Sequence, residues 1–233
     1  MIGDIINRLN GELPATVKLV AVSKFHPFEA IEEAYRAGQR IFAESRPQEL
    51  LAKVRRLEEV RLERGETDHM SDIQWHFIGH LQTNKLKMVL PYVSMVQSVD
   101  SVRLLEAINA WGLANNKVIS VLLEPHVAAE ETKQGFSADE LSDVLEKAAQ
   151  GMFPAVQFKG IMGMATFTDD ESVIRADFAA LREIYDEAKS AFFSDSESFS
   201  EFSIGMSDDY HTAIEYGSTM VRIGSMIFGE RSY

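Results

Sequence analysis

The sequence has 233 residues, of which 36 are acidic and 23 basic, so its formal net charge at pH 7 is -13. It contains no cysteine, which excludes disulfides, thiolate nucleophiles and cysteine-ligated zinc or iron–sulfur sites. The acidic excess argues against a protein that binds nucleic acid or anionic membranes, because such proteins carry a basic face. Its apolar runs fall short of the roughly 20 residues that cross a bilayer.

The first residues, Met1–Pro14, contain an early acid and no long apolar segment, so we expect no signal peptide. Together with the absence of cysteine, this predicts a protein of the cytoplasm. Length leaves one domain or two open, since α/β barrels of about 200–250 residues often form a single domain.

Short apolar segments alternate with longer ones along the chain. The short segments are rich in Val, Ile and Phe, which is typical of strands buried on both faces. We place eight strands at Val17–Lys24, Arg40–Ser45, Gln74–Gly79, Val93–Val99, Lys117–Glu124, Gln157–Ala165, Glu201–Met206 and Met220–Gly224. In the longer segments apolar residues recur three and four positions apart, which predicts helices. These are expected at Gly3–Leu9, Phe28–Ala37, Pro47–Arg64, Asn84–Leu90, Ser101–Ala114, Ala138–Gln150, Glu171–Phe193 and Asp208–Tyr216.

Helix start and stop signals agree with these boundaries. Ser137 precedes a predicted helix and Glu140 follows it by three positions, which is the spacing of a capping box. Pro47 falls at an early helical position, where a missing N–H is tolerated. Gly38 and Gly151 come directly after predicted helices and are suited to end them.

Alternating strands and helices predict parallel pairing with right-handed crossovers. Eight such units close most simply into a (β/α)8 TIM barrel, and we expect residues 1–233 to form this single α/β domain. A doubly wound open sheet is the alternative. Two polar segments, Gly65–Ser71 and Ser194–Ser200, are predicted to be surface loops rather than linkers.

Lys24 closes the first predicted strand, at the end where barrels place their active sites. Burial favours the neutral amine of a lysine, which is the form that attacks an aldehyde to give an imine. The alternative is that Lys24 points into solvent, and one lysine taken alone favours that alternative.

The last two predicted strands end in a candidate phosphate site. Ser207 follows the seventh strand and is placed to cap the next helix, while Gly224 and Ser225 follow the eighth. Barrels frequently bind phosphate in these two loops with the help of a helix N-terminus. Each residue taken alone is equally compatible with an ordinary cap or turn.

Barrel closure brings the first strand beside the eighth, so Lys24 is expected next to Arg222 and the phosphate site. A reactive amine, a phosphate site and an inward arginine together match pyridoxal 5′-phosphate (PLP), an aldehyde that carries a phosphate. An arginine that faces the pyridine nitrogen leaves it largely unprotonated and weakens the electron sink. The alternative is that Arg222 pairs with an acid.

Several motifs, in order along nearly the whole chain, resemble those of a known family. They are Val20–Lys24 with Pro27, Trp75–Lys85, Lys133–Phe136, Gly160–Ala165, Ile204–Asp208, Gly217–Thr219, Val221–Ser225 and Ile227–Gly229. The chain resembles the pyridoxal phosphate homeostasis proteins, also called proline synthetase co-transcribed homologues. These are relatives of the alanine racemase N-terminal barrel.

The resemblance implies a PLP-binding barrel with Lys24 as the imine lysine. It implies that Ser207, Gly224 and Ser225 surround the phosphate and that Arg222 lies near the ring nitrogen. It also implies a role in balancing free PLP and amino-acid pools rather than robust turnover. The partners expected are PLP itself and PLP-dependent enzymes that lack their cofactor, with no nucleic acid and no membrane, and the chain is expected to be a monomer.

One residue departs from the family pattern. The family usually has Gly-Glu-Asn-Arg after the second strand, where this chain has Ala43–Arg46 with Ser45 in place of the asparagine. The family asparagine touches the cofactor region. Serine is shorter and lacks the second amide donor, so we expect PLP to bind with a water in the gap.

Two further side chains are candidates for the cofactor pocket. His80, at the end of the third strand, either faces the cofactor or points away from it. Met206 either lines the pocket or fills core space, as do Met162 and Met164. His76 and His80 stand four apart, but they straddle a strand end without a nearby carboxylate, so we predict no metal site.

Two-base racemisation needs an acid or base on each face of the substrate carbon. Alanine racemase takes its second group, a tyrosine, from a β-rich domain. This sequence ends at Tyr233, shortly after the eighth strand, so we expect that domain to be missing and turnover to be slow. Two alternatives stay open: a PLP-dependent racemase or lyase, and a PLP-free phosphate-binding barrel enzyme such as an aldolase.

Overall fold

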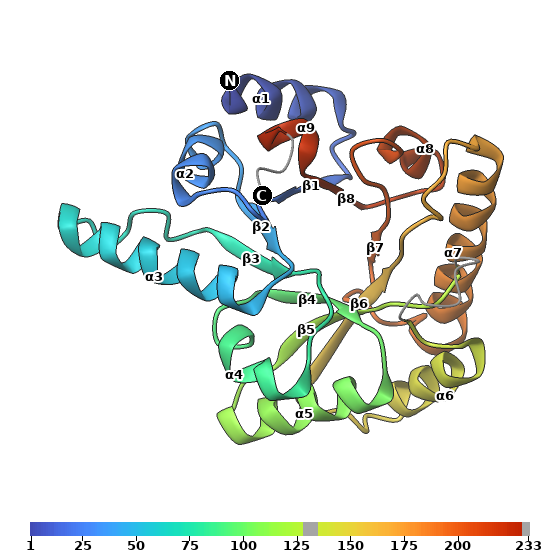
Figure 1. Ribbon diagram of the computed structural model, residues 1–233. Helices are drawn as coiled ribbons and strands as arrows, with labels where there is room; N and C mark the ends of the chain where they lie inside the picture. Colours follow the sequence, from blue (N-terminus) through green and yellow to red (C-terminus); the bar gives the residue numbers. More distant parts are fainter. Residues whose placement is uncertain (128–134, 230–233) are drawn as a thin grey trace.

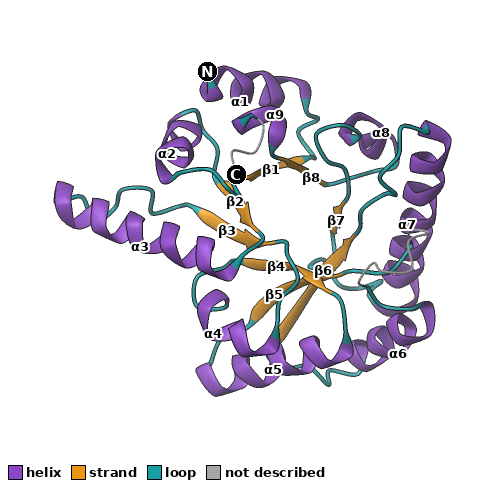
Figure 2. Cartoon of the chain, viewed as in Figure 1, coloured by secondary structure: helices purple, strands orange, loops and turns teal. Residues whose placement is uncertain are grey.

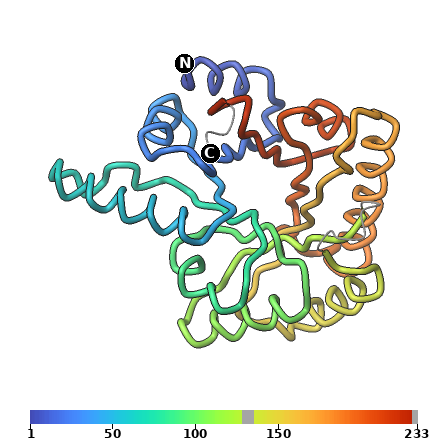
Figure 3. The backbone as a smooth tube through the Cα atoms, in the orientation of Figure 1, coloured from blue at the N-terminus to red at the C-terminus, as the bar shows by residue number. Residues whose placement is uncertain are grey.

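The described residues, 1–127 and 135–229 of a computed structural model, form a closed barrel of parallel strands that pair in chain order (Figure 1). Its strands are β1 Lys18–Val22, β2 Ile41–Glu44, β3 Gln74–Phe77, β4 Met95–Val99, β5 Ile119–Leu123, β6 Val156–Met162, β7 Glu201–Ser203 and β8 Met220–Ile223. Pairing of β1 with β8 closes the ring. In Figure 3 the blue and red ends of the tube therefore lie side by side. The predicted TIM barrel is confirmed, and the open sheet is wrong.

Helices form an outer ring around the strands (Figure 2). They are α1 Ile2–Glu12, α2 Phe28–Arg36, α3 Pro47–Arg64, η1 Thr83–Lys85, α4 Leu86–Val89, α5 Val102–Asn115, α6 Ala138–Ala149, α7 Glu171–Phe192, α8 Tyr210–Glu215 and α9 Ser225–Phe228. The predicted helix Asn84–Leu90 is split between η1 and α4. Helix α9 was not predicted, because one turn is too short to show a helical period. Within the described ranges, no helix is long and apolar enough to cross a bilayer.

The predicted helix boundaries at four positions are confirmed. Ser137 and Glu140 make both hydrogen bonds of a capping box at the start of α6, and Pro47 is the first residue of α3. Gly38 and Gly151 follow α2 and α6 with φ angles of 99° and 76°, a left-handed backbone that suits glycine.

The barrel has two apolar cores because side chains alternate along each strand. On β1, Leu19 and Ala21 face the helices and belong to the large outer core. Val20 and Val22 face the inside of the ring and pack in a small inner core. The other members of the inner core are Ala43, Met95, Leu122, Met162 and Met220.

Seven of the eight strands end one to three residues earlier than predicted, and two of these ends, those of β1 and β7, matter for the site. After β1 the chain turns at once, and Phe25 takes a φ of 69°. After β7 the backbone turns at Gly205, where φ is 95° and an added Cβ would lie 2.6 Å from the Cβ of Ala213. Lys24 and Ser207 therefore lie in loops at the carboxyl end of the barrel rather than on strands.

Candidate cofactor site

A cavity of about 290 Å³ opens at the carboxyl end of the barrel, where loops follow β1, β6, β7 and β8. Its size is close to the lower limit of about 300 Å³ that is typical of small-molecule pockets. The structure brings six of the eight predicted cofactor residues to its wall. They are Lys24, Met206, Ser207, Arg222, Gly224 and Ser225.

Lys24 is half-buried and lines the cavity, so it does not simply point into solvent. Val22 and Ile78 add apolar wall, and Met162 and Met164 extend it, which is one of the two roles that the sequence left open for these methionines. The sequence did not predict His26, whose ring stacks on Phe228 at 5.2 Å between centroids and which also borders the cavity.

The two serines come together at one end of the cavity. Ser225 Oγ donates a hydrogen bond to Ser207 Oγ at 3.1 Å, which joins the first residue of α9 to the loop after β7. Gly224 packs tightly here, since an added Cβ would lie 3.2 Å from the carbonyl oxygen of Val22. Two hydroxyls beside close-packed backbone can surround a phosphate group.

The predicted capping role of Ser207 is wrong. Helix α8 starts at Tyr210 and its N-cap is Asp209, which makes no side-chain capping bond. Instead, Asp209 Oδ1 accepts the N–H of Met206 at 2.5 Å. The loop turns at Gly205 before the helix begins, so Ser207 faces Ser225 instead of the helix.

Arg222 is 4% exposed and is held inside the barrel by oxygen atoms. Its Nη1 donates to the carbonyl oxygen and to Oγ of Ser203, at 2.6 and 2.7 Å, and its Nη2 donates to the carbonyl of Gly163 at 2.8 Å. These contacts replace the acid partner that was the alternative. Burial lowers the pKa of Arg222 to about 10, opposed by the nearby charges of Glu124 and Asp209. The guanidinium stays charged at neutral pH.

A chain of side-chain hydrogen bonds continues from Arg222 across the interior of the barrel. Ser203 Oγ donates to Gln97 Oε1 at 2.8 Å, and Gln97 Nε2 lies 2.8 Å from His76 Nδ1. Burial lowers the pKa of His76 to about 3, helped by the charge of Lys18, so its ring is neutral. The amide nitrogen of Gln97 can only donate, so Nδ1 of the neutral His76 ring accepts this bond.

Sequence reasoning missed this chain, although a signal for it exists. Gln97 and Ser203 are polar residues in strands whose residues are all buried, and both are fully buried themselves. Buried polar side chains need partners, so each should have prompted a search for one.

Glu124 is a second buried group that the sequence did not single out. It follows β5 at the carboxyl end of the barrel and is 8% exposed. Burial raises the pKa of its carboxyl to about 7; the charge of Arg222 opposes the shift and that of Asp100 adds to it.

Ser45 and His80 do not border the cavity. The backbone of Ser45 packs on Gly79, where an added Cβ would lie 2.1 Å from the Ser45 carbonyl oxygen. His80 Nδ1 lies 2.8 Å from Asp100 Oδ2, and the half-exposed imidazole borders a neighbouring pocket instead. Their contact with a cofactor stays a prediction.

His76 and His80 have separate partners, and within residues 1–127 and 135–229 no cluster of three or more His, Asp or Glu could hold a metal ion. Lys133 and Gln134, from one of the family-like motifs, lie outside the described residues.

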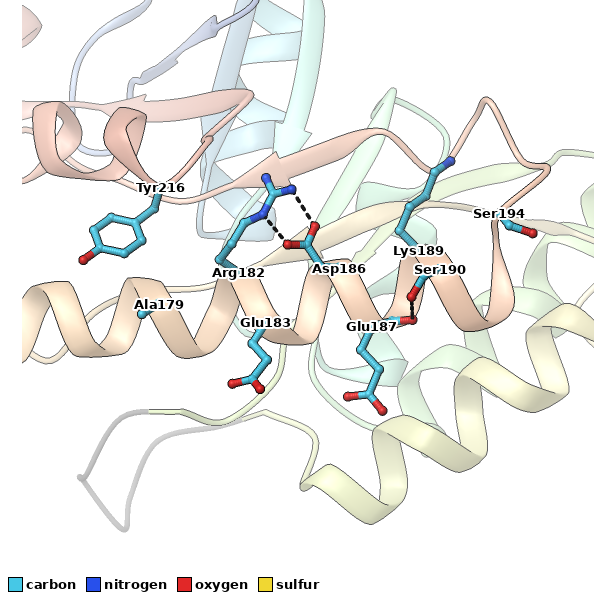
Figure 4. A pocket seen from close by; sticks show the side chains of 9 residues that line it. All are labelled: Ala179, Arg182, Glu183, Asp186, Glu187, Lys189, Ser190, Ser194 and Tyr216. Atoms are coloured by element: carbon cyan, nitrogen blue, oxygen red, sulfur yellow. Dashed lines mark hydrogen bonds and ion pairs between the residues drawn. The ribbon is translucent and has the colours of Figure 1, made fainter.

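A larger hollow lies along α7 and shares no residue with the cavity (Figure 4). Its polar groups bond to one another: Arg182 pairs with Asp186 at 2.5 and 2.8 Å, and Ser190 donates to the carbonyl oxygen of Glu187. Tyr216 lies at its edge. The carboxylates of Glu183 and Glu187 also line this hollow and take no part in these bonds.

The model of the alanine racemase N-terminal domain family matches residues 5–232. The chain belongs to this family. Among the members of known role, the pyridoxal phosphate homeostasis protein of Aquifex aeolicus is 36% identical over 216 residues, which are 93% of this chain and 88% of that protein. The Bos taurus protein of the same name is 38% identical over 229 residues, 95% of this chain and 80% of its own length. The resemblance to the homeostasis proteins is confirmed.

Solved structures of the family agree. PipY of Synechococcus elongatus PCC7942, with PLP bound, is 31% identical, with a TM-score of 0.84 over 98% of this chain and 100% of its own. Alanine racemase from E. faecalis is 17% identical with a TM-score of 0.68, and the match covers 98% of this chain but 57% of that enzyme. At that identity the racemase shares the fold alone.

Proposed function

We propose that this protein holds PLP as an imine on Lys24 and serves PLP homeostasis without robust catalysis. The observation that carries the proposal is the convergence of an amine, two hydroxyls and a buried arginine on one cavity, at Lys24, Ser207, Ser225 and Arg222. Its support from relatives is the name of the homeostasis proteins and the PLP bound in PipY.

Each residue has one task in this proposal. The neutral amine of Lys24 adds to the aldehyde carbon, and loss of water leaves a carbon–nitrogen double bond. The hydroxyls of Ser207 and Ser225 bind the phosphate, while the tight packing at Gly224 brings backbone close to it. Arg222 has donors beyond those used for Ser203 and Gly163, and one of them would face the pyridine nitrogen of bound PLP.

The arginine also explains why turnover is slow. PLP supplies an electron sink, and the sink is strong only when its ring nitrogen is protonated. Arg222 is a charged donor that keeps its own proton, so the nitrogen stays an acceptor. Among the described residues that line the cavity there is no tyrosine that could act as a second acid or base.

We further propose that the protein works in the cytoplasm, as a monomer, on free PLP and amino-acid pools. Enzymes that lack their PLP are the partners that such a carrier would serve.

An absorption spectrum followed by borohydride reduction tests the proposal. The purified protein with added PLP should show an imine band, and reduction should fix one PLP on the peptide that contains Lys24, as read by mass spectrometry. Lys24→Ala should lose both signals. The control Lys87→Ala, at an exposed lysine on α4, should keep them. A protein that ignores PLP, or an adduct on another lysine, would overturn the proposal.

The racemase alternative differs in one measurement. If it holds, alanine should interconvert between its two mirror forms at an enzymatic rate that Lys24→Ala abolishes. The aldolase alternative requires an imine with a carbonyl substrate in a protein that does not bind PLP.

Ser45→Asn tests the departure from the family pattern. If the missing amide weakens the cofactor contact, this change should tighten PLP binding, measured by titration. Unchanged affinity would show that Ser45 causes no loss, in agreement with its place outside the cavity wall.

A further inference from the structure

The turn that carries Lys24, residues 23–26, contains a backbone conformation that its sequence does not favour. Phe25 has a φ of 69°, in the left-handed region. Glycine or asparagine adopts this region readily, whereas a bulky side chain there is uncommon and costs free energy. Such strain persists only where surrounding contacts hold it, and it often marks a functional site.

Helix α3 makes contacts on the outer side of this turn. Glu49 Oε2 accepts the backbone N–H of Phe25 at 2.9 Å. The guanidinium of Arg46 lies 4.5 Å from the centre of the Phe25 ring and 3.4 Å from Glu49 Oε1. One residue of the turn is thus held at both its backbone and its side chain by the first turn of a long helix.

Ser23, the residue before Lys24, is held by a buried ion pair. Lys53 of α3 donates to the carbonyl oxygen of Ser23 at 2.7 Å and to Glu44 Oε1 at 2.5 Å. The hydroxyl of Ser23 donates to the same carboxylate oxygen at 2.6 Å. Ser23 and Glu44 are fully buried and Lys53 is 7% exposed. The peptide before Lys24 therefore has little freedom to move.

We propose that Glu49 is a positioning residue for Lys24: with Arg46 and Lys53, it holds the strained turn so that the amine points into the cavity. Lys24 lies between the two residues that α3 fixes, so the direction of its Cα–Cβ bond is set by α3. This inference rests on the proposed imine at Lys24. It adds a role for a helix whose residues, apart from these contacts, do not reach the cavity wall.

Affinity for PLP in matched Glu49 variants tests the inference. Glu49→Ala removes the acceptor of the Phe25 N–H, so the turn relaxes and the dissociation constant for PLP should rise about tenfold. Glu49→Gln keeps an acceptor oxygen and should stay within about threefold of the wild type. Glu58→Ala, at an exposed acid of the same helix, is the matched control and should bind as the wild type does.

A double-mutant cycle with Phe25→Gly separates positioning from packing. Glycine adopts a φ of 69° without strain, so the turn no longer depends on Glu49. In the Phe25→Gly background, Glu49→Ala should change the dissociation constant by less than about threefold. A penalty of the same size in both backgrounds would overturn the inference.

Further outcomes show whether only the role of Glu49 fails or whether the proposed imine on Lys24 fails as well. If the wild type forms a borohydride-fixed adduct on Lys24 while Glu49→Ala binds PLP as well as Glu58→Ala, only the role of Glu49 is overturned. The same holds if Glu49→Ala lowers the melting temperature without changing affinity, because that is a structural effect alone. If the wild type forms no adduct on Lys24, both fall together.

Discussion

Arg222 depends on Ser203 for two of its three described hydrogen bonds, one of which is to the hydroxyl. Ser203→Ala removes that hydroxyl and leaves Gln97 Oε1 buried without its donor. A buried polar atom that loses its partner costs about 1–3 kcal/mol. We expect stability to fall by that amount and the absorption band of bound PLP to shift, because the guanidinium that we propose to face the ring nitrogen loses part of its support.

Urea denaturation and a PLP titration monitored by absorption measure the two effects. Ser203→Thr, which keeps the hydroxyl, serves as the control for the lost oxygen. An alanine variant with the wild-type spectrum would show that the carbonyl contacts alone fix Arg222.

Glu124 makes stability depend on pH. Its pKa is about 7 in the folded protein against 4.5 for an ordinary glutamate. Between these values the folded protein holds a proton that the unfolded chain has lost, so this group favours folding less as the pH rises. Glu124→Gln should match the wild type below about pH 4.5 and exceed its stability by up to about 3 kcal/mol above pH 7.

Urea denaturation at a series of pH values measures this difference. His76 acts in the opposite sense: its pKa of about 3 lies below the ordinary 6.5, so it destabilises the fold as the pH falls. His76→Gln serves as a comparison: its gain in stability over the wild type should grow as the pH falls, whereas the gain of Glu124→Gln should grow as the pH rises. Parallel curves for the wild type and Glu124→Gln would contradict the prediction.

The sequence reveals single residues best where their chemistry is rare for their position. Lys24 stands out because a lysine rarely ends an apolar strand, and Arg222 because it lies within one. The partners that hold Arg222 cannot be identified in this way, since Gly163 and Ser203 lie 59 and 19 positions away in the sequence. Their distances depend on the stagger of the barrel, which a local pattern does not encode.

At the scale of elements, α3 and β2 are joined by the buried pair of Lys53 and Glu44. Lys53→Met leaves the carboxylate of Glu44 buried with the Ser23 hydroxyl as its described donor. Breaking one side of a buried ion pair costs about 3–5 kcal/mol. Burial already raises the pKa of Glu44, so the loss should be larger at high pH, where protonation cannot relieve the charge.

Denaturation of the variant at two pH values measures this loss. The double variant Glu44→Gln with Lys53→Met removes the charge as well and should recover most of the stability. A single variant as stable as the wild type would mean that the pair contributes nothing to the contact between α3 and β2.

The long helices could be predicted from the sequence because their apolar pattern repeats over several turns and their capping residues are local. Helix α3 begins at Pro47 and ends at Arg64, as predicted. The carboxyl ends of most strands could not be predicted to the residue, because the chain leaves the sheet at turns such as those at Phe25 and Gly205, whose left-handed φ angles a local pattern does not show. Helix α9 and the η1–α4 pair are short, and tertiary contacts rather than periodicity define them.

At the scale of the molecule, binding of PLP should stabilise the whole barrel. A ligand at 100 times its dissociation constant adds about 2.7 kcal/mol, which for a chain of this size corresponds to roughly 5–10 °C in melting temperature. Scanning calorimetry with and without PLP measures the shift. Lys24→Ala should lose most of it at the same PLP concentration, and an equal shift in that variant would show that the lysine does not anchor the ligand.

The net charge of -13 and an anionic ligand are compatible in this molecule. Many acidic side chains lie on the outer helices, where ion pairs such as Arg175 with Glu171 are exposed to solvent. Arg222 is buried at the cavity, where water screens its charge less. The cavity therefore carries charges of both signs, with Lys24 and Arg222 on its wall beside the acidic Asp208. That all 233 residues form one domain stays a prediction.

The pairing of β1 with β8 also determines when the site can form during synthesis and folding. The ring closes when residues about 200 positions apart in the chain pair with each other, as Val20 and Arg222 do. Lys24 follows β1, whereas Arg222 lies on β8, and Gly224 and Ser225 come directly after that strand. A ribosome must therefore complete β8 before the cavity exists, and contacts of such long range form late in folding. In refolding experiments, the appearance of the PLP absorption band should thus mark the moment at which the first and last strands of the barrel join.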